Sequence, residues 1–139
     1  MYIGEFMKRE IDKLAWLYIR DGMLLNARSQ GKTLFYLPGG KREKGESDEQ
    51  ALVREIKEEI SVDLALNSIK YAETFQAKAD GKDSDTIVKL TCYFADFVGK
   101  LAPAAEIEEI RFISYKDKSL CSLGGIKVME WLKDQDLIK

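Results

Sequence analysis

The chain contains no histidine, and only two cysteines and two prolines occur among its 139 residues. The absence of histidine excludes imidazole as a general base, as a metal ligand and as the partner of a serine or cysteine nucleophile. Any acid–base chemistry therefore falls to carboxylates, lysine, tyrosine or water. Cys92 and Cys121 stand among apolar or small residues, so we expect reduced packing residues rather than a disulfide framework.

Long apolar runs and a large excess of one charge are also missing. No run approaches the roughly 20 residues that span a bilayer, and residues 1–10, which we expect to be a flexible N-terminus, lack the apolar core of a signal peptide. The net charge of −2 argues against a membrane-surface protein and against broad nucleic-acid binding. We expect a cytoplasmic protein with a single domain over residues 1–139, and its oligomeric state, monomer or homodimer, stays open.

Hydrophobic patterning predicts several strands and two helices. The expected strands are residues 14–20, 23–28, 33–37, 68–77, 86–98 and 110–115, and Asp21-Gly22 is a hairpin signal between the first two. One helix should begin just after Ser47, which fits a capping box with Gln50, and should end near Ile60. A second helix is indicated near the C-terminus by the spacing of Ile126, Met129 and Leu132. Strands with one helix in the middle and one at the end predict a layered α/β domain.

The expected central helix carries three glutamates on one stripe. Glu55, Glu58 and Glu59 stand at i, i+3 and i+4, so their carboxylates are neighbours. The like-charge pair of Glu55 and Glu59 costs roughly 0.2–0.5 kcal/mol. A solvated helix surface is the commoner explanation for three glutamates taken alone, but a bound cation would remove the repulsion. Oxygen ligands of this kind suit Mg²⁺ or Mn²⁺.

The loop before this helix contains further candidate site residues. The glycine pair that ends with Gly40 lets the backbone turn sharply and expose carbonyl oxygens, so the Gly40 carbonyl is a candidate for a further metal ligand. Glu46 lies in the loop and Arg54 lies on the helix. A charge-assisted contact between these two side chains would pin the loop to the helix.

Together, these residues resemble the Nudix hydrolase signature. That signature is a glycine, five residues, a glutamate, seven residues, Arg-Glu, an apolar residue, any residue, Glu-Glu, any residue, a glycine and an apolar residue. The matching residues are Gly40, Glu46, Arg54, Glu55, Ile56, Glu58, Glu59 and Val62. One position departs, because Ser61 stands where the family has glycine. The family glycine closes the helix with a positive φ, so a serine there should cost on the order of 1 kcal/mol.

The resemblance implies a fold, an activity and a cofactor. The implied fold is a mixed β-sheet sandwiched between α-helices. The implied activity is hydrolysis of a phosphoanhydride bond in a nucleoside diphosphate linked to another group. The implied cofactor is Mg²⁺, for which Mn²⁺ can substitute, and its ligands would be the Gly40 carbonyl and the carboxylates of Glu55, Glu58 and Glu59.

The resemblance also suggests roles for other residues. Arg54 belongs to the catalytic part of the motif. The general base is either Glu55 or Glu59 in the motif or an acid on a distal loop, where the candidates are Glu106, Glu108 and Glu109. We favour Glu106, because it precedes the last expected strand, although a solvated loop acid is the simpler alternative. Arg28 and Lys41 are the candidates for contact with the polyphosphate of a small nucleotide substrate.

The substrate subgroup follows only by elimination. The downstream proline and tyrosine that mark the ADP-ribose, NADH and diadenosine-polyphosphate subgroups are missing, which leaves the MutT-type nucleoside triphosphate pyrophosphohydrolases. Some Nudix-fold proteins bind a nucleotide or a partner without hydrolysis, but this chain keeps every metal-ligand glutamate. The candidates for stacking on a base are Phe35, Tyr36, Phe75 and Tyr93, although residues at strand spacing more often belong to the core.

Overall fold

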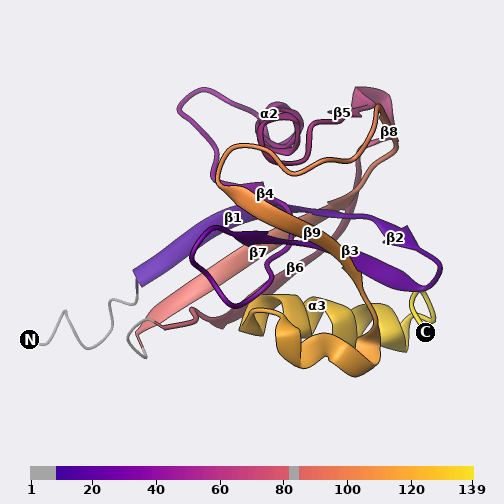
Figure 1. Ribbon diagram of the computed structural model, residues 1–139. Coiled ribbons are helices and arrows are strands. Elements are labelled where there is room, and N and C mark those ends of the chain that lie inside the picture. Colours follow the sequence, from indigo (N-terminus) through magenta and orange to yellow (C-terminus); the bar gives the residue numbers. More distant parts are fainter. Residues whose placement is uncertain (1–8, 82–84) are drawn as a thin grey trace, which may run out of the picture.

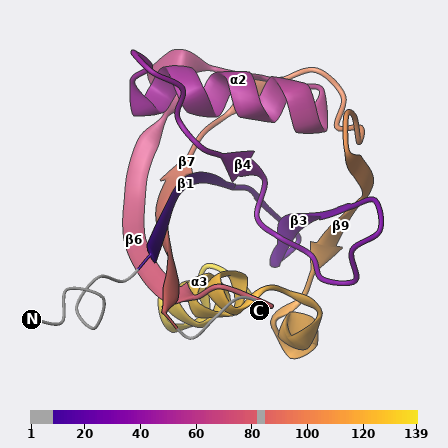
Figure 2. The same ribbon diagram turned by 90° about the vertical axis from the view of Figure 1, so that its left-hand side faces the viewer.

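The computed structural model describes residues 9–81 and 85–139. Its β-strands form a central layer, with α2 (Asp48–Ile60) covering one side and α3 (Leu123–Asp134) covering the other (Figures 1 and 2). The predicted α/β class, with sheet between helices, is therefore confirmed. Within the described ranges, none of the helices has both the length and the apolar character that crossing a bilayer requires.

The central layer consists of separate sheets rather than one. The mixed sheet has the order β4-β1-β7-β6, in which β1 (Arg9–Leu17) runs parallel to β7 (Thr86–Phe94). Its antiparallel neighbours are β4 (Gly39–Gly40) beside β1 and β6 (Lys70–Lys78) beside β7. An antiparallel sheet is formed by β2 (Ile19–Arg20), β3 (Met23–Ser29) and β9 (Ile107–Ile113), and a small pair by β5 (Asp63–Leu64) and β8 (Phe97–Val98).

The predicted hairpin turn is present, but the strand before it is broken. Asp21 and Gly22 have φ values of 53° and 75°, as a two-residue hairpin turn with two left-handed residues requires. The expected strand 14–20 divides at Tyr18, whose carbonyl accepts a hydrogen bond from the Leu25 amide (2.9 Å). Residues before Tyr18 pair with β7, and residues after it pair with β3, so this point joins the two sheets.

Other predicted strand boundaries are also corrected. Residues 33–37 form no regular strand, because only isolated bridges from Phe35 and Tyr36 connect them to the rest of the fold. The expected strand 86–98 breaks after Phe94, where the chain bends to form β8. The last strand begins three residues earlier than expected, at Ile107, and a 3₁₀ helix, η2 (Tyr115–Leu120), follows it.

The core lies on both faces of the strand layer. Along β1, Leu14 and Trp16 belong to the cluster that packs against α2, while Ala15 and Leu17 belong to the cluster that packs against α3. A strand covered on both faces loses the usual alternation of apolar and polar residues. Both cysteines are free and buried among the packing residues of the α3 cluster, and burial raises the pKa of Cys92 to about 12.

The two ends of α2 follow the sequence closely. The Ser47 hydroxyl accepts from the Gln50 amide (3.1 Å) while the Gln50 side chain accepts from the Ser47 amide (2.9 Å), which is the predicted capping box. Ser61 has φ 73°, so the left-handed helix end is retained without glycine. Its hydroxyl donates to the Ala102 carbonyl (2.9 Å), a contact that glycine cannot make and that offsets part of the conformational cost.

Candidate active site

A polar cavity of about 290 Å³ opens beside the C-terminal half of α2. It collects side chains from β1, β3, the segment that precedes α2, the helix itself and the loop before β9. Its lining residues are Lys13, Ala27, Ser29, Lys32, Tyr36, Leu37, Gly39, Glu59, Glu106 and Ile107. The cavity therefore contains two of the predicted acidic residues, Glu59 and Glu106.

Arg54 connects the loop before α2 to the acidic stripe of the helix. Its Nε and Nη2 atoms donate to the two carboxylate oxygens of Glu46 at 2.7 and 2.8 Å, which is the predicted pin in bidentate form. Nη2 also donates to the Lys41 carbonyl (3.1 Å), and Nη1 donates to Glu55 (2.7 Å). The Arg54 guanidinium and the Glu43 amide hold the pKa of Glu46 down to about 2.

Glu55 lies against the backbone of Gly40. A Cβ atom at position 40 would collide with the Glu55 carboxylate, so only glycine allows this approach. Burial raises the pKa of Glu55, and the Arg54 hydrogen bond opposes that rise. The Gly40 backbone and the Glu55 carboxylate therefore lie side by side.

Glu59 is the most perturbed acid of the site. Its carboxylate accepts a hydrogen bond from the Gly39 amide at 3.2 Å. Burial raises its pKa to about 8 despite that hydrogen bond, and the nearby charges of Glu55 and Glu106 add to the rise. The positive charge of Lys13, which arrives from β1, acts in the opposite direction. A buried acid with acidic neighbours becomes favourable as an anion when a cation joins it.

The donor chemistry fits a hard divalent cation, but the three helix carboxylates are not gathered around one point. Glu55 is held by Arg54, and Glu58 projects outward with 54% of its side chain exposed, 3.5 Å from Arg54. Across residues 9–81 and 85–139, no group of three or more acidic or cysteine side chains is close enough to hold a metal ion. Glu55 lies against the Gly40 backbone and Glu59 binds the Gly39 amide, whereas Glu58 would have to turn inward to join them. The assignment of these three carboxylates as metal ligands stays a prediction.

The loop that carries Glu106 is fastened to the end of α2. The Ala102 amide donates to the Ile60 carbonyl (3.0 Å) and the Ala104 amide donates to the Glu59 carbonyl (2.9 Å). Ser61 adds its side-chain hydrogen bond to the same segment. The residue that departs from the motif therefore helps to place an exposed acid, Glu106, at the wall of the cavity. In contrast, Glu108 and Glu109 bind Arg28 at 3.4 and 3.2 Å.

The structure places the predicted phosphate-binding residues outside the cavity lining. Arg28 pairs with the β9 acids, whereas its neighbours Ala27 and Ser29 line the cavity. The Lys41 side chain is exposed and is absent from the lining. The lining lysines are instead Lys13 and Lys32, which sequence reasoning missed. The position of Lys13 on a strand paired with β7 and β4 carries no local motif, so only the strand register reveals it.

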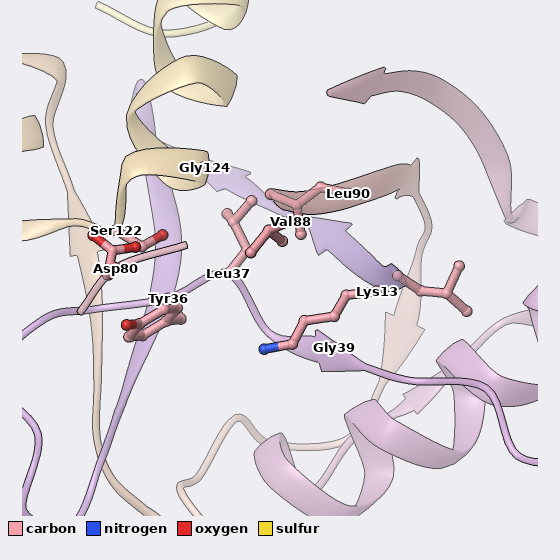
Figure 3. Close-up of a pocket in the computed structure, with 10 residues that line it drawn as sticks. Lys13, Tyr36, Leu37, Gly39, Asp80, Val88, Leu90, Ser122 and Gly124 are labelled. Carbon is pink, nitrogen blue, oxygen red and sulfur yellow. The ribbon is translucent and has the colours of Figure 1, made fainter. Parts of the chain in front are cut away.

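A narrow apolar slot of about 50 Å³ continues from the polar cavity. The two share Lys13, Tyr36, Leu37 and Gly39. The slot extends toward the start of α3 and is lined further by Leu14, Asp80, Val88, Leu90, Ser122 and Gly124 (Figure 3). Cavity and slot share lining residues and are treated as one cleft, with a charged part and a mostly apolar part. Such a cleft suits a ligand that is charged at one end and apolar at the other.

Comparisons with known proteins support the resemblance found in the sequence. The family model described as the NUDIX domain matches residues 10–131, while no curated protein matches the chain. The solution structure of the E. coli ORF135 protein is 27% identical, with 96% of this chain and 94% of that chain covered and a TM-score of 0.71.

Two further solved structures share the fold. The MutT NUDIX hydrolase from Burkholderia pseudomallei is 21% identical, with 79% of this chain and 87% of that chain covered and a TM-score of 0.65. A bifunctional NMN adenylyltransferase/ADP ribose pyrophosphatase from Francisella tularensis, complexed with AMP and a Mn ion, is 19% identical. Its match covers 93% of this chain and 42% of that chain, with a TM-score of 0.66.

The raised pKa of Glu59 predicts how stability depends on pH. The unfolded carboxyl titrates near 4.5 and the folded one near 8, so the folded state keeps a proton that the unfolded state has lost. Stability of the metal-free protein should therefore fall as pH rises from about 5 to 8. Glu59→Gln removes this titration while keeping an acceptor for the Gly39 amide.

Thermal unfolding in EDTA at several pH values measures the effect. The melting temperature of Glu59→Gln relative to the parent should increase steadily from pH 5 to 8. Glu58→Gln, which neutralises an exposed acid of the same turn, controls for the loss of one charge. A difference between Glu59→Gln and the parent that stays constant across this range would contradict the prediction.

Proposed function

This chain belongs to the Nudix domain family and is a Nudix hydrolase, and we propose that it is a Mg²⁺-dependent, MutT-type nucleoside triphosphate pyrophosphohydrolase. The family supports pyrophosphohydrolase activity on nucleoside diphosphate derivatives. The finer assignment, to release of a nucleoside monophosphate and pyrophosphate, is our proposal.

The observation that carries this proposal is the division of the cleft into two chemical halves. The polar cavity contains two lysines and two glutamates, whereas the adjoining slot is walled by Leu14, Leu37, Val88 and Leu90. A nucleoside triphosphate has the same division, with charged phosphates at one end and a planar base at the other. A cavity of about 290 Å³ next to a narrower slot supports a substrate of this kind.

Residues of α2 and the preceding loop would hold Mg²⁺. The ligands proposed are the carboxylates of Glu55, Glu58 and Glu59 and the carbonyl of Gly40. When bound, the cation would neutralise phosphate oxygens and lower the pKa of a coordinated water. Arg54 holds Glu55 and the loop in register for this task.

Lysine and glutamate side chains of the cavity would supply the other two functions, phosphate binding and proton transfer. Lys13 and Lys32 line the cavity and would bind phosphate oxygens, in place of the predicted Arg28 and Lys41. Glu106 lies at the wall of the same cavity and would accept the proton of the attacking water. Glu59 is the less suitable base, because a metal-bound carboxylate has little basicity left for proton transfer.

Product analysis with a nucleotide panel tests the proposed function. In the presence of Mg²⁺, the protein should convert nucleoside triphosphates to monophosphate and pyrophosphate, separated by ion-exchange chromatography. EDTA should abolish the reaction, and added Mg²⁺ or Mn²⁺ should restore it. Release of inorganic phosphate and nucleoside diphosphate, or full turnover in excess EDTA, would contradict the proposal.

Glu106→Gln tests the assignment of the base. If Glu106 takes the proton of water, kcat should fall by about 10²- to 10⁴-fold, with little change in KM, because the interaction exists only in the transition state. Glu108→Gln is the matched control, since it alters an exposed acid two residues away that contacts Arg28. A Glu106→Gln rate within threefold of the parent would move the role to Glu55 or Glu59.

A further inference from the structure

The apolar slot has a polar far end that the proposed hydrolysis does not use. Most of its wall is apolar, but Asp80, Ser122 and Tyr36 bring oxygen atoms to one side of it (Figure 3). A Cβ on Gly124 would approach the Leu90 side chain, which also lines the slot, to 2.7 Å. The slot has room for a few water molecules, and therefore for the edge of a planar ring.

Asp80 is anchored in place by the start of α3. The Leu123 amide donates to both oxygens of the Asp80 carboxylate, each at 3.2 Å. A carboxylate has about four acceptor positions, so one shared N–H group leaves capacity for further donors. The side chain is half-buried, and its oxygens offer only acceptors to the slot.

Asp80 also lines a neighbouring hollow, outside the slot, that it shares with Lys32. The basic residue that lines the slot is Lys13, whose ammonium group lies 5.9 Å from the centre of the Tyr36 ring (Figure 3). Ser122 is buried, and its hydroxyl accepts from the Gly125 amide at 3.1 Å as the cap of α3. Among the described residues, the polar end of the slot is therefore lined by one carboxylate, that of Asp80, and by the hydroxyl groups of Ser122 and Tyr36.

We propose that Asp80 is a specificity-determining residue, which selects nucleotides whose base carries an exocyclic amino group. This inference rests on the proposed function, since it concerns the base of the substrate hydrolysed in the adjoining cavity. The amino group of cytosine, adenine or guanine supplies the N–H donors that a carboxylate requires. The 4-carbonyl of uracil or thymine places an acceptor at the position where cytosine has its amino group.

The selection is effective because an unpaired acceptor beside Asp80 costs more free energy than a matched donor gains. An acceptor that faces the Asp80 carboxylate leaves two oxygens without a proton between them, and it excludes the water that would otherwise solvate the charge. A pocket that forms hydrogen bonds to a polar group of its substrate rejects an analogue that lacks the group more strongly than an apolar pocket rejects a change of shape. Cytosine and uracil have almost the same shape, so a difference in kcat/KM between CTP and UTP reports the contribution of hydrogen bonding.

The test compares kcat/KM for CTP and UTP, with Mg²⁺, in the parent protein and in Asp80→Asn. The parent should prefer CTP by about 10- to 100-fold, as hydrogen bonds to charged groups imply. Asparagine keeps an oxygen for the Leu123 amide and adds an amino donor, so the preference should shrink to within about threefold through a lower rate on CTP and a higher rate on UTP.

Asp96→Asn is the matched control, because Asp96 is exposed in the connection between β7 and β8 and does not line the cleft. It should leave the CTP preference unchanged, and thermal unfolding should show that both variants are folded. GTP and ITP, which differ only in the 2-amino group, provide a second pair with the same expected direction for the parent.

The outcomes separate the two proposals. Hydrolysis of CTP and UTP at equal efficiency by the parent would overturn the role of Asp80 while leaving the pyrophosphohydrolase intact. A preference for CTP that persists in folded Asp80→Asn would also overturn it, since the discrimination would then arise elsewhere. Failure to hydrolyse any nucleotide would instead overturn the proposed function, and with it the basis of this inference.

Discussion

The arrangement of the site depends on the hydrogen bonds of a single guanidinium group, that of Arg54. It binds both oxygens of Glu46, the carbonyl of Lys41 and the carboxylate of Glu55. Isolated surface ion pairs contribute little to stability. This one is bidentate and joins the loop to the helix, where it adds to the capping box of Ser47 and the hydrogen bond from the Gly39 amide to Glu59. The Glu55 carboxylate is held by this guanidinium, while Gly40 beside it is held by the pairing of β4 with β1.

A second constraint is the partial burial of acidic groups beside one another. The core side of α2 is fully buried through Leu52, Ile56 and Ile60, which brings Glu59 down against the Gly39 amide. Burial then disfavours the charged form of Glu59 and raises its pKa. The fold thus holds an acid where ionisation is costly without a cation. Acids whose pKa is raised in this way are typical of functional sites, where a protein gives up part of its folding stability.

Features at fixed local offsets could be predicted from the sequence. The capping box of Ser47 with Gln50, the contact of Glu46 with Arg54 and the positive φ of Ser61 all depend on spacing along one helix and its flanks. The hydrogen bond from Ser61 to Ala102 was not predictable, because residues 61 and 102 are brought together only by tertiary folding. The serine therefore looked like strain alone, although it also fastens the loop that carries Glu106.

Residues that reach the cleft from a strand and a loop outside the motif were the main omission. Lys13 and Lys32 belong to no motif, and the direction of a strand side chain depends on register, which here is set by the parallel pairing of β1 with β7. A shift of one residue would turn Lys13 to the other face. Arg28 shows the same dependence, since the residues on either side of it line the cavity while its own side chain pairs with Glu108 and Glu109.

The dependence of the site on Arg54 is tested most directly by the nucleotide hydrolysis rate of Arg54→Lys, with Arg42→Lys as the control. Lysine keeps the charge but cannot serve both Glu46 oxygens and Glu55 at once. Arg42 binds Asp12 and Asp48 outside the cleft, so Arg42→Lys disturbs a comparable ion-pair group without touching the carboxylates of the cavity. We predict that kcat falls at least about tenfold in Arg54→Lys, as the loss of a charge-assisted hydrogen bond implies, and stays near the parent value in Arg42→Lys. An Arg54→Lys protein with the parent rate would contradict the account.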